Sequence, residues 1–199
     1  MREFIKNKLR ESFTKHITEV KNSGYEAYHG SPYKIKKFND NFISGKDAID
    51  QQGPGIYFTD SNEEAIGYAG ENGYVYQVRL HPKKLLSSEP KNNLEFLTNT
   101  VIKLIKMSPN WKRVARSYDD DIETGLNDMV YSYIGQNQTE KDVFISIFND
   151  IYQNNPIDYV RNMVKLGYDG IYLPTKSGGE HIVMYNPSLI EYINSKAVK

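Results

Sequence analysis

The spacing of apolar residues changes along the chain and sets an N-terminal segment apart. Over residues 2–22, apolar side chains recur at helical spacing, and Asn22-Ser23-Gly24 ends the pattern. We therefore expect an N-terminal helix within residues 1–24. Its polar face is mildly basic, which is compatible with binding to a membrane surface, but its glutamates dilute that attraction and favour packing on the domain.

Strand-like segments with one short helix follow. Aromatic and β-branched residues predict strands within residues 25–32, 56–59 and 74–80. Ser61 and Glu64 have the spacing of a capping box, which predicts a helix that starts here and that Gly70 can end. Residues 39–54 are polar and finish in a glycine-rich run, as expected of a loop.

From about residue 92 to residue 166 the periodicity becomes helical, and Pro156 opens the last helix. Strands return afterwards, within residues 168–173, 181–185 and 189–193. The pattern predicts an α+β fold in a single domain, residues 1–199, with a helical insertion at 92–166. We interpret the insertion either as a lid or as a module that recognises a partner.

Composition narrows the class of protein. The 25 Lys and Arg residues balance 25 Asp and Glu residues, which disfavours a non-specific DNA binder. Cysteine is absent and the four histidines form no HExxH motif, so we expect no metal. No stretch holds ~18 consecutive apolar residues and the start lacks a signal peptide, so we expect a cytoplasmic chain without a membrane span. The 16 tyrosines outnumber the 8 phenylalanines, so many aromatic rings carry a hydroxyl.

Three short polar segments, which we call the polar islands, lie where the expected strands meet loops. Binding and catalytic sites are usually built at such places. In His29-Gly30-Ser31, the glycine lets a ligand approach the backbone because it has no Cβ. Tyr57, on a strand, and Tyr68, on the next helix, could enclose a flat ligand. Glu180 places a carboxylate at the mouth of a strand, where it could stabilise positive charge. Each feature alone also fits an ordinary turn, core tyrosine or surface acid.

In this order, the islands resemble the motifs of the ADP-ribosyltransferase superfamily, specifically its His-Tyr-Glu class, which includes diphtheria toxin and the poly(ADP-ribose) polymerases. Tyr28-His29-Gly30-Ser31 is similar to the first-strand motif of that class. Residues 53–60 resemble the glycine-rich approach to the second motif, and Tyr68 follows at the family's spacing. Glu180-His181-Ile182-Val183 is similar to the strand that carries the family's glutamate.

The resemblance covers roughly residues 25–82 and 166–193. It implies split antiparallel β-sheets around a cleft that binds NAD+ as a substrate, without a metal. The backbone of Gly30 would bind the nicotinamide carboxamide. His29 would hydrogen-bond the adenosine ribose, and Ser31 the ribose next to the nicotinamide.

The remaining roles implied by the resemblance concern the reacting end of NAD+. Tyr57 and Tyr68 would enclose the nicotinamide ring. Glu180 would bind the 2′-hydroxyl of the adjacent ribose and favour the oxocarbenium-like transition state that forms as nicotinamide leaves. The resemblance thus implies an NAD+ ADP-ribosyltransferase that releases nicotinamide and modifies a macromolecule.

Two positions depart from the pattern of the class. Gly178 stands two residues before Glu180, where related enzymes carry a residue that reports the acceptor, and His181 stands where many polymerases have tyrosine. Glycine at this position does not report the acceptor. We expect a protein acceptor, with nucleic acid as the alternative. The rest of the chain leaves no room for an automodification domain, which favours mono-ADP-ribosylation by a monomer.

Two other functions stay open at this stage. NAD+ glycohydrolysis would use water as the acceptor, and a catalytically inactive chain would serve as a binding module. The setting that best suits a compact transferase of this kind is a bacterial or phage effector or toxin that acts in a cytoplasm.

Two polar clusters lie outside the resemblance. Asp119-Asp120-Asp121 is compatible with a cation site, but aspartates before Ile122 are more typical of a helix N-terminus. Trp111 with its neighbouring basic residues could touch a nucleic acid or an acidic partner, although a solvated helix face explains the same pattern.

Overall fold

The computed structural model describes residues 24–43, 53–87, 90–91, 93–152, 155–174 and 179–198. The expected N-terminal helix, most of the loop expected at 39–54 and the glycine-rich turn that contains Gly178 lie outside the described residues. In the part that is described, no helix is both long and apolar enough to cross a membrane.

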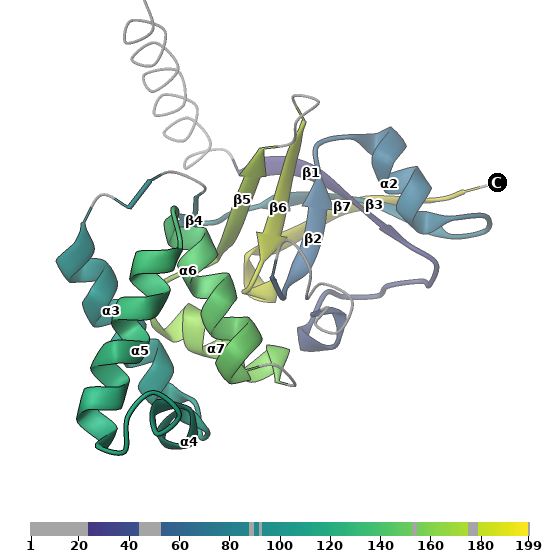
Figure 1. The fold of residues 1–199 in the computed structure, drawn as a ribbon. Helices are drawn as coiled ribbons and strands as arrows, with labels where there is room; N and C mark the ends of the chain where they lie inside the picture. The colour runs from purple at the N-terminus through teal and green to yellow at the C-terminus, as the bar shows by residue number, and fades with distance from the viewer. Residues whose placement is uncertain are drawn as a thin grey trace, which may run out of the picture.

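One seven-stranded sheet forms the body of the chain, in the order β4-β5-β6-β2-β1-β3-β7 (Figure 1). Its strands are β1 (Tyr25–Ser31), β2 (Ile56–Thr59), β3 (Tyr74–Leu80), β4 (Leu85–Leu86), β5 (Gly170–Pro174), β6 (Glu180–Met184) and β7 (Ile190–Ala197). The pair β4–β5 is parallel and the other neighbours are antiparallel. The aromatic and β-branched segments identified in the sequence are therefore strands, as their composition favours.

The expected pair of split sheets differs from the observed sheet, which is continuous and contains one parallel pair. The join between its two halves is nevertheless narrow. Among the described residues, the ladder between β1 and β2 consists of the single pair Tyr28–Thr59, whereas β1 and β3 are paired along the whole of β1. On its β2 side, β1 is therefore held by far fewer ladder pairs than on its β3 side.

Helices gather at two places around this sheet. Figure 1 shows α2 beside β1 and β3, and the remaining α-helices clustered near β4, β5 and β6 at the other side. The helical elements are η1 (Asp40–Phe42), α2 (Asn62–Ala69), α3 (Leu94–Met107), α4 (Trp111–Ala115), α5 (Ile122–Gln136), α6 (Glu140–Ile147), the π-helical turn η2 (Phe148–Tyr152), α7 (Pro156–Lys165) and η3 (Pro187–Leu189). Helices α3 to α7 thus fall within the segment expected to be helical.

Side-chain caps define the starts of these helices. Asp121 accepts a hydrogen bond from the Thr124 backbone N–H, at 2.9 Å, and so caps α5 as the aspartate run predicted. Pro156 lies at the start of α7, where its missing N–H costs nothing. Trp111 is packed against the main core and has Lys106 and Lys112 over its ring, which makes it part of the packing of the helices.

The main core joins the helices to the sheet, and tyrosines supply much of it. Tyr152 and Tyr159 are buried, and their hydroxyls donate to the backbone carbonyls of Leu104 and Phe144, at 2.8 and 3.1 Å. A buried phenol needs such a partner because an unpaired hydroxyl would lose its hydrogen bond to water. Much of the tyrosine excess in the composition is thus structural.

Candidate active site

His29 stands at the narrow join of the sheet. Its ring packs against Phe38, Phe58 and Tyr76, and its Nδ1 lies 2.8 Å from the backbone carbonyl of Tyr57 on β2. A carbonyl can only accept, so Nδ1 carries the hydrogen and Nε2 of the neutral ring is an acceptor. Burial lowers the pKa of His29, and the hydrogen bond to Tyr57 offsets part of that effect.

This contact replaces a step of the sheet ladder. The pair Tyr28–Thr59 would place Gly30 opposite Tyr57 in a regular antiparallel register. Instead, the carbonyl of Tyr57 accepts from the side chain of His29. The imidazole therefore bridges β1 and β2 where their ladder ends, next to Gly30.

Gly30 itself has a structural reason to be glycine. A Cβ built on it would overlap the backbone carbonyl oxygen of Ala65 and would lie 2.7 Å from the backbone nitrogen of Ala69, both on α2. The missing side chain thus lets α2 pack directly on β1. The sequence pointed to close approach by a ligand, whereas the structure shows close approach by a helix on the face where the side chain would be. Next to it, the buried Ser31 accepts a hydrogen bond from the Tyr33 backbone N–H, at 3.1 Å.

Tyr57 and Tyr68 belong to the same side of the sheet. Tyr57 lies two residues before Thr59, whose hydroxyl contacts α2, so alternation puts both side chains on the α2 face. The Tyr57 hydroxyl donates to the carbonyl of Gly53, and burial raises the pKa of Tyr57. Tyr68 is 63% exposed and its hydroxyl donates to Glu64, at 3.3 Å. One ring is therefore held by the fold, and the other is open to solvent.

Glu180 is the first residue of β6, and its carboxylate accepts a hydrogen bond from the hydroxyl of Tyr172, at 2.6 Å. Its backbone carbonyl accepts from the N–H of Asp60, at 3.1 Å, which continues the pairing of β2 with β6. Because neighbouring residues of a strand alternate, Glu180 lies on the opposite face from His181 and on the same face as Phe58. This is also the face of the His29 ring.

The candidate residues are therefore brought to three adjacent strands but not to one face. His29 and Glu180 lie on the face that carries Phe58, and Tyr57 lies on the opposite face, with Thr59 and α2.

The sequence analysis missed one cluster, which centres on Glu64 of α2. One carboxylate oxygen of Glu64 accepts from the Thr59 hydroxyl, at 2.6 Å, and the other lies 2.8 Å from Nε2 of His181 and 3.3 Å from the Tyr68 hydroxyl. These contacts tie β2, α2 and β6 together. Burial raises the pKa of Glu64, but the hydrogen bonds from Thr59 and His181, the charge of His181 and the Tyr68 bond outweigh it, so the pKa is lowered overall.

The capping box expected at this helix explains why Glu64 was overlooked. The first half of the box is confirmed, because the Ser61 hydroxyl accepts from the Glu64 backbone N–H, at 3.1 Å. In the second half, the Thr59 hydroxyl takes the Ser61 N–H that a glutamate would usually accept. The Glu64 carboxylate is thereby released for Thr59 and His181. A local motif cannot predict the contact with His181, which lies 117 residues further along the chain.

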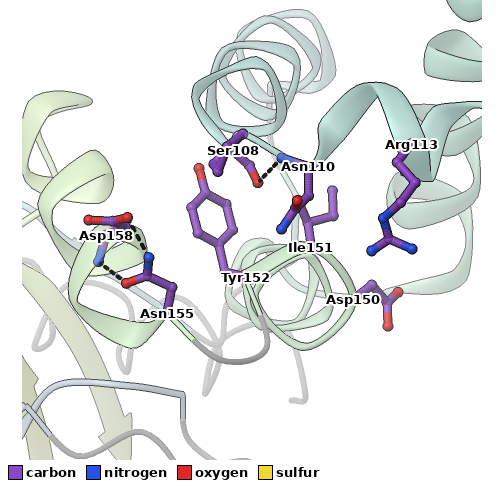
Figure 2. A pocket seen from close by; sticks show the side chains of 9 residues that line it. Ser108, Asn110, Arg113, Asp150, Ile151, Tyr152, Asn155 and Asp158 are labelled. Carbon is purple, nitrogen blue, oxygen red and sulfur yellow. Dashed lines mark hydrogen bonds between the residues drawn. The ribbon is translucent and has the colours of Figure 1, made fainter.

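A cavity of about 310 Å³ lies elsewhere, among the helices (Figure 2). Its lining includes Ser108, Asn110 and Arg113 on one side and Asp150, Tyr152 and Asp158 on the other. It contains none of the residues that the motifs single out. In the described part of the chain, no group of His, Cys, Asp and Glu residues has the arrangement to hold a metal ion.

The fold and the three motif-bearing strands are consistent with an ADP-ribosyltransferase. The model of one protein family, described as ADP-ribosyltransferase in polyvalent proteins, matches residues 23–198. The chain therefore belongs to this family of the ADP-ribosyltransferase superfamily.

Two further comparisons add little. No curated protein is significantly similar to the chain. One solved structure, described as the crystal structure of an anti-CRISPR protein, is similar with a TM-score of 0.35 and 13% identity, over 85% of this chain and 96% of that chain. A likeness of that size carries no argument about fold or function.

Proposed function

We propose that this chain is an NAD+-dependent mono-ADP-ribosyltransferase of the His-Tyr-Glu class, with a macromolecular acceptor that is protein. The family match supports ADP-ribosyl transfer. The observation that carries the finer proposal is the interrupted ladder at His29, Gly30 and Tyr57, beside the strand that begins with Glu180. It combines a strand edge without ladder pairing with an imidazole, aromatic rings and a carboxylate.

These residues fit the chemistry of NAD+. An open strand edge at Gly30 would offer backbone hydrogen bonds to a carboxamide, which has the same donor and acceptor as a peptide group. Neutral His29, with Nε2 as an acceptor, suits a ribose hydroxyl, and Ser31 supplies a second hydroxyl nearby. Tyr57 and Tyr68 supply the rings that would enclose the nicotinamide.

Glu180 would act on the bond that breaks. The bond between C1′ of the ribose and the nicotinamide nitrogen breaks, the electron pair leaves with nicotinamide, and the ribose becomes oxocarbenium-like. A carboxylate that binds the 2′-hydroxyl stabilises this positive charge more than it stabilises the ground state. Tyr172 holds one oxygen of Glu180 through its 2.6 Å hydrogen bond and so fixes the carboxylate before substrate arrives. The acceptor then bonds to C1′ and loses a proton.

The test compares Glu180→Gln with the wild type, using NAD+ labelled on its adenylate part together with a cell lysate. Nicotinamide release should fall by about 10²–10³ in the variant, because a contact specific to the transition state is lost. The affinity for NAD+ and the melting temperature should change little. Glu95→Gln, an exposed first-turn glutamate of α3, is the matched control and should keep wild-type rates.

The products distinguish the possible activities. Label on a macromolecule supports transfer, and mass spectrometry of that species identifies the acceptor. Nicotinamide release without labelled macromolecule would replace transfer by NAD+ hydrolysis. No release by the wild type, or an equal rate in Glu180→Gln, would overturn the proposal and favour a binding module.

A further inference from the structure

Glu64 connects three elements that each carry a residue of the proposed site. Through Thr59 it reaches β2, two residues beyond Tyr57. Through His181 it reaches β6, at the residue next to Glu180. On its own helix it reaches Tyr68, one turn further on.

The chemistry of the cluster gives each group one role. A carboxylate can only accept, so the Thr59 hydroxyl, the Tyr68 hydroxyl and the Nε2 atom of His181 all donate to Glu64. Donation from Nε2 to the carboxylate also fixes the orientation of the His181 ring. The carboxylate lies in the first turn of α2, where the backbone N–H groups favour a negative charge.

The exposure of the partners indicates which of them depends on Glu64. Thr59 is buried and His181 is paired in the centre of the sheet, so their positions are held by the fold. Tyr68 is 63% exposed, and the hydrogen bond to Glu64 is the polar contact that orients its ring. Loss of that contact would leave the Tyr68 side chain free to adopt other rotamers.

We propose that Glu64 is a positioning residue for NAD+ binding: it fixes the Tyr68 ring and holds α2 against β2 and β6, and so sets the distance between the Tyr57 and Tyr68 rings that would enclose the nicotinamide. This inference rests on the proposed function. It assigns Glu64 no contact with the substrate, and its effect is therefore on binding more than on the bond-breaking step.

The test measures NAD+ affinity by titration calorimetry and the kinetics of nicotinamide release for Glu64→Gln. The amide keeps the size of the side chain but cannot accept from all three donors. We expect the Kd and KM for NAD+ to rise about tenfold, with a much smaller change in kcat. The matched control is Glu63→Gln, which removes the same charge from the same helical turn on the exposed side of α2 and should behave as the wild type.

A double-mutant cycle identifies the route through Tyr68. Tyr68→Phe keeps the ring and removes the hydroxyl that binds Glu64. If Glu64 acts by positioning this ring, the double variant will lose less NAD+ binding free energy than the sum of the losses in the two single variants. Additive losses in the double variant would overturn the positioning of Tyr68.

The hydrogen bond between His181 and Glu64 provides a second test if Glu64→Gln fails to fold. His181→Gln places an amide N–H near the position of Nε2, whereas His181→Ala removes the donor. We expect near wild-type NAD+ affinity for the glutamine variant and weaker binding for the alanine variant. Equal affinity in both His181 variants, or a lower melting temperature of Glu64→Gln with unchanged NAD+ affinity, would reduce the cluster to a structural role and overturn the inference.

The outcomes separate this inference from the proposed function. If the wild type binds and cleaves NAD+ and Glu64→Gln matches Glu63→Gln, the positioning role fails and the function stands. If Glu180→Gln keeps the wild-type rate while Glu64→Gln binds NAD+ more weakly, the catalytic proposal fails and the positioning role stands. A wild type that binds no NAD+ overturns both.

Discussion

The sheet region around β1, β2 and β6 and the helical region from α3 to α7 use polar side chains in different ways. In the helical region, polar contacts are mostly local: Asn93, Asp121 and Thr139 each cap the helix that follows them. In the sheet region they join distant parts of the chain, as between Glu64 and His181. The helical contacts define where elements begin, whereas the contacts in the sheet hold one element at a set distance from another.

The same contrast appears in the buried groups. Rings such as Phe144 and Phe148 fill the helical core, and the buried hydroxyls of Tyr152 and Tyr159 donate to backbone carbonyls. The sheet region instead keeps a half-buried imidazole and two carboxylates, on Glu64 and Glu180, next to its narrow join. Such groups cost stability when they are buried and are usual where chemistry is done. We infer that the helical region mainly supplies stability and that the sheet region supplies the site.

The largest expected effect tests whether the helical region mainly supplies stability. Phe144 is fully buried in α6 and packs against the ring of Tyr168, with ring centroids 5.4 Å apart. Phe144→Ala should reduce the free energy of unfolding by about 3–5 kcal/mol, because a cavity replaces the ring. Denaturant unfolding measures the loss. Nicotinamide release per folded molecule, assayed well below the melting temperature, should match the wild type; a fall in that rate would mean that the helical region also shapes the site.

A smaller effect tests the packing of α2 on the sheet. Gly30→Ala forces a Cβ against the Ala65 carbonyl, and a backbone group cannot move aside as a side chain can. We expect a loss of about 1–3 kcal/mol in unfolding free energy, with weaker NAD+ binding as α2 shifts. Gly67→Ala is the matched control, since a Cβ there meets nothing within 4 Å and alanine is the better helix former. It should raise stability slightly and leave NAD+ binding unchanged; equal NAD+ affinities for the two variants would contradict this account of α2.

The two regions also differ in how far the sequence could predict them. Helix starts depend on residues a few positions apart, so the caps at Ser61 and Asp121 could be predicted from local spacing. Glu64 was assigned to the same local motif, and only the tertiary structure shows that Thr59 displaces it toward His181. The sheet register has the same limit, since no local pattern predicts that β1 and β2 meet at a single pair.

Gly30 illustrates the limit in a different way. The sequence indicated that glycine at this position permits close approach to the backbone, but several kinds of neighbour can make that approach. Its position on β1 opposite α2 identifies the helix as that neighbour, which a resemblance between motifs could not do. The chemical type of a residue was thus predictable from the sequence, whereas the group that it meets depended on contacts between remote segments.

The smallest expected effect uses pH to separate the regions. Residues 94–165 contain no histidine, so titration near pH 6 belongs to the rest of the chain. The pKa of His29 is lowered from 6.5 by burial in the folded state. Between pH 6.5 and the lower pKa of the folded state, the unfolded chain binds more protons than the folded chain does. The free energy of unfolding therefore falls as the pH falls, and His29 contributes at most about 1.4 kcal/mol per pH unit to this slope. Above that range the ring is neutral in both states and contributes no slope.

His29→Asn tests this assignment because its amide can still donate to the Tyr57 carbonyl but does not titrate. Denaturant unfolding between about pH 7.5 and pH 5.5 should show a shallower loss of stability in the variant than in the wild type. If the two slopes are equal, the proton uptake arises elsewhere and His29 is not the buried neutral group at the join of the sheet. A shallower slope together with weaker NAD+ binding would place the titrating group and the substrate site together at the join between β1 and β2. The stability that the buried His29 costs at low pH would then be tied to substrate binding.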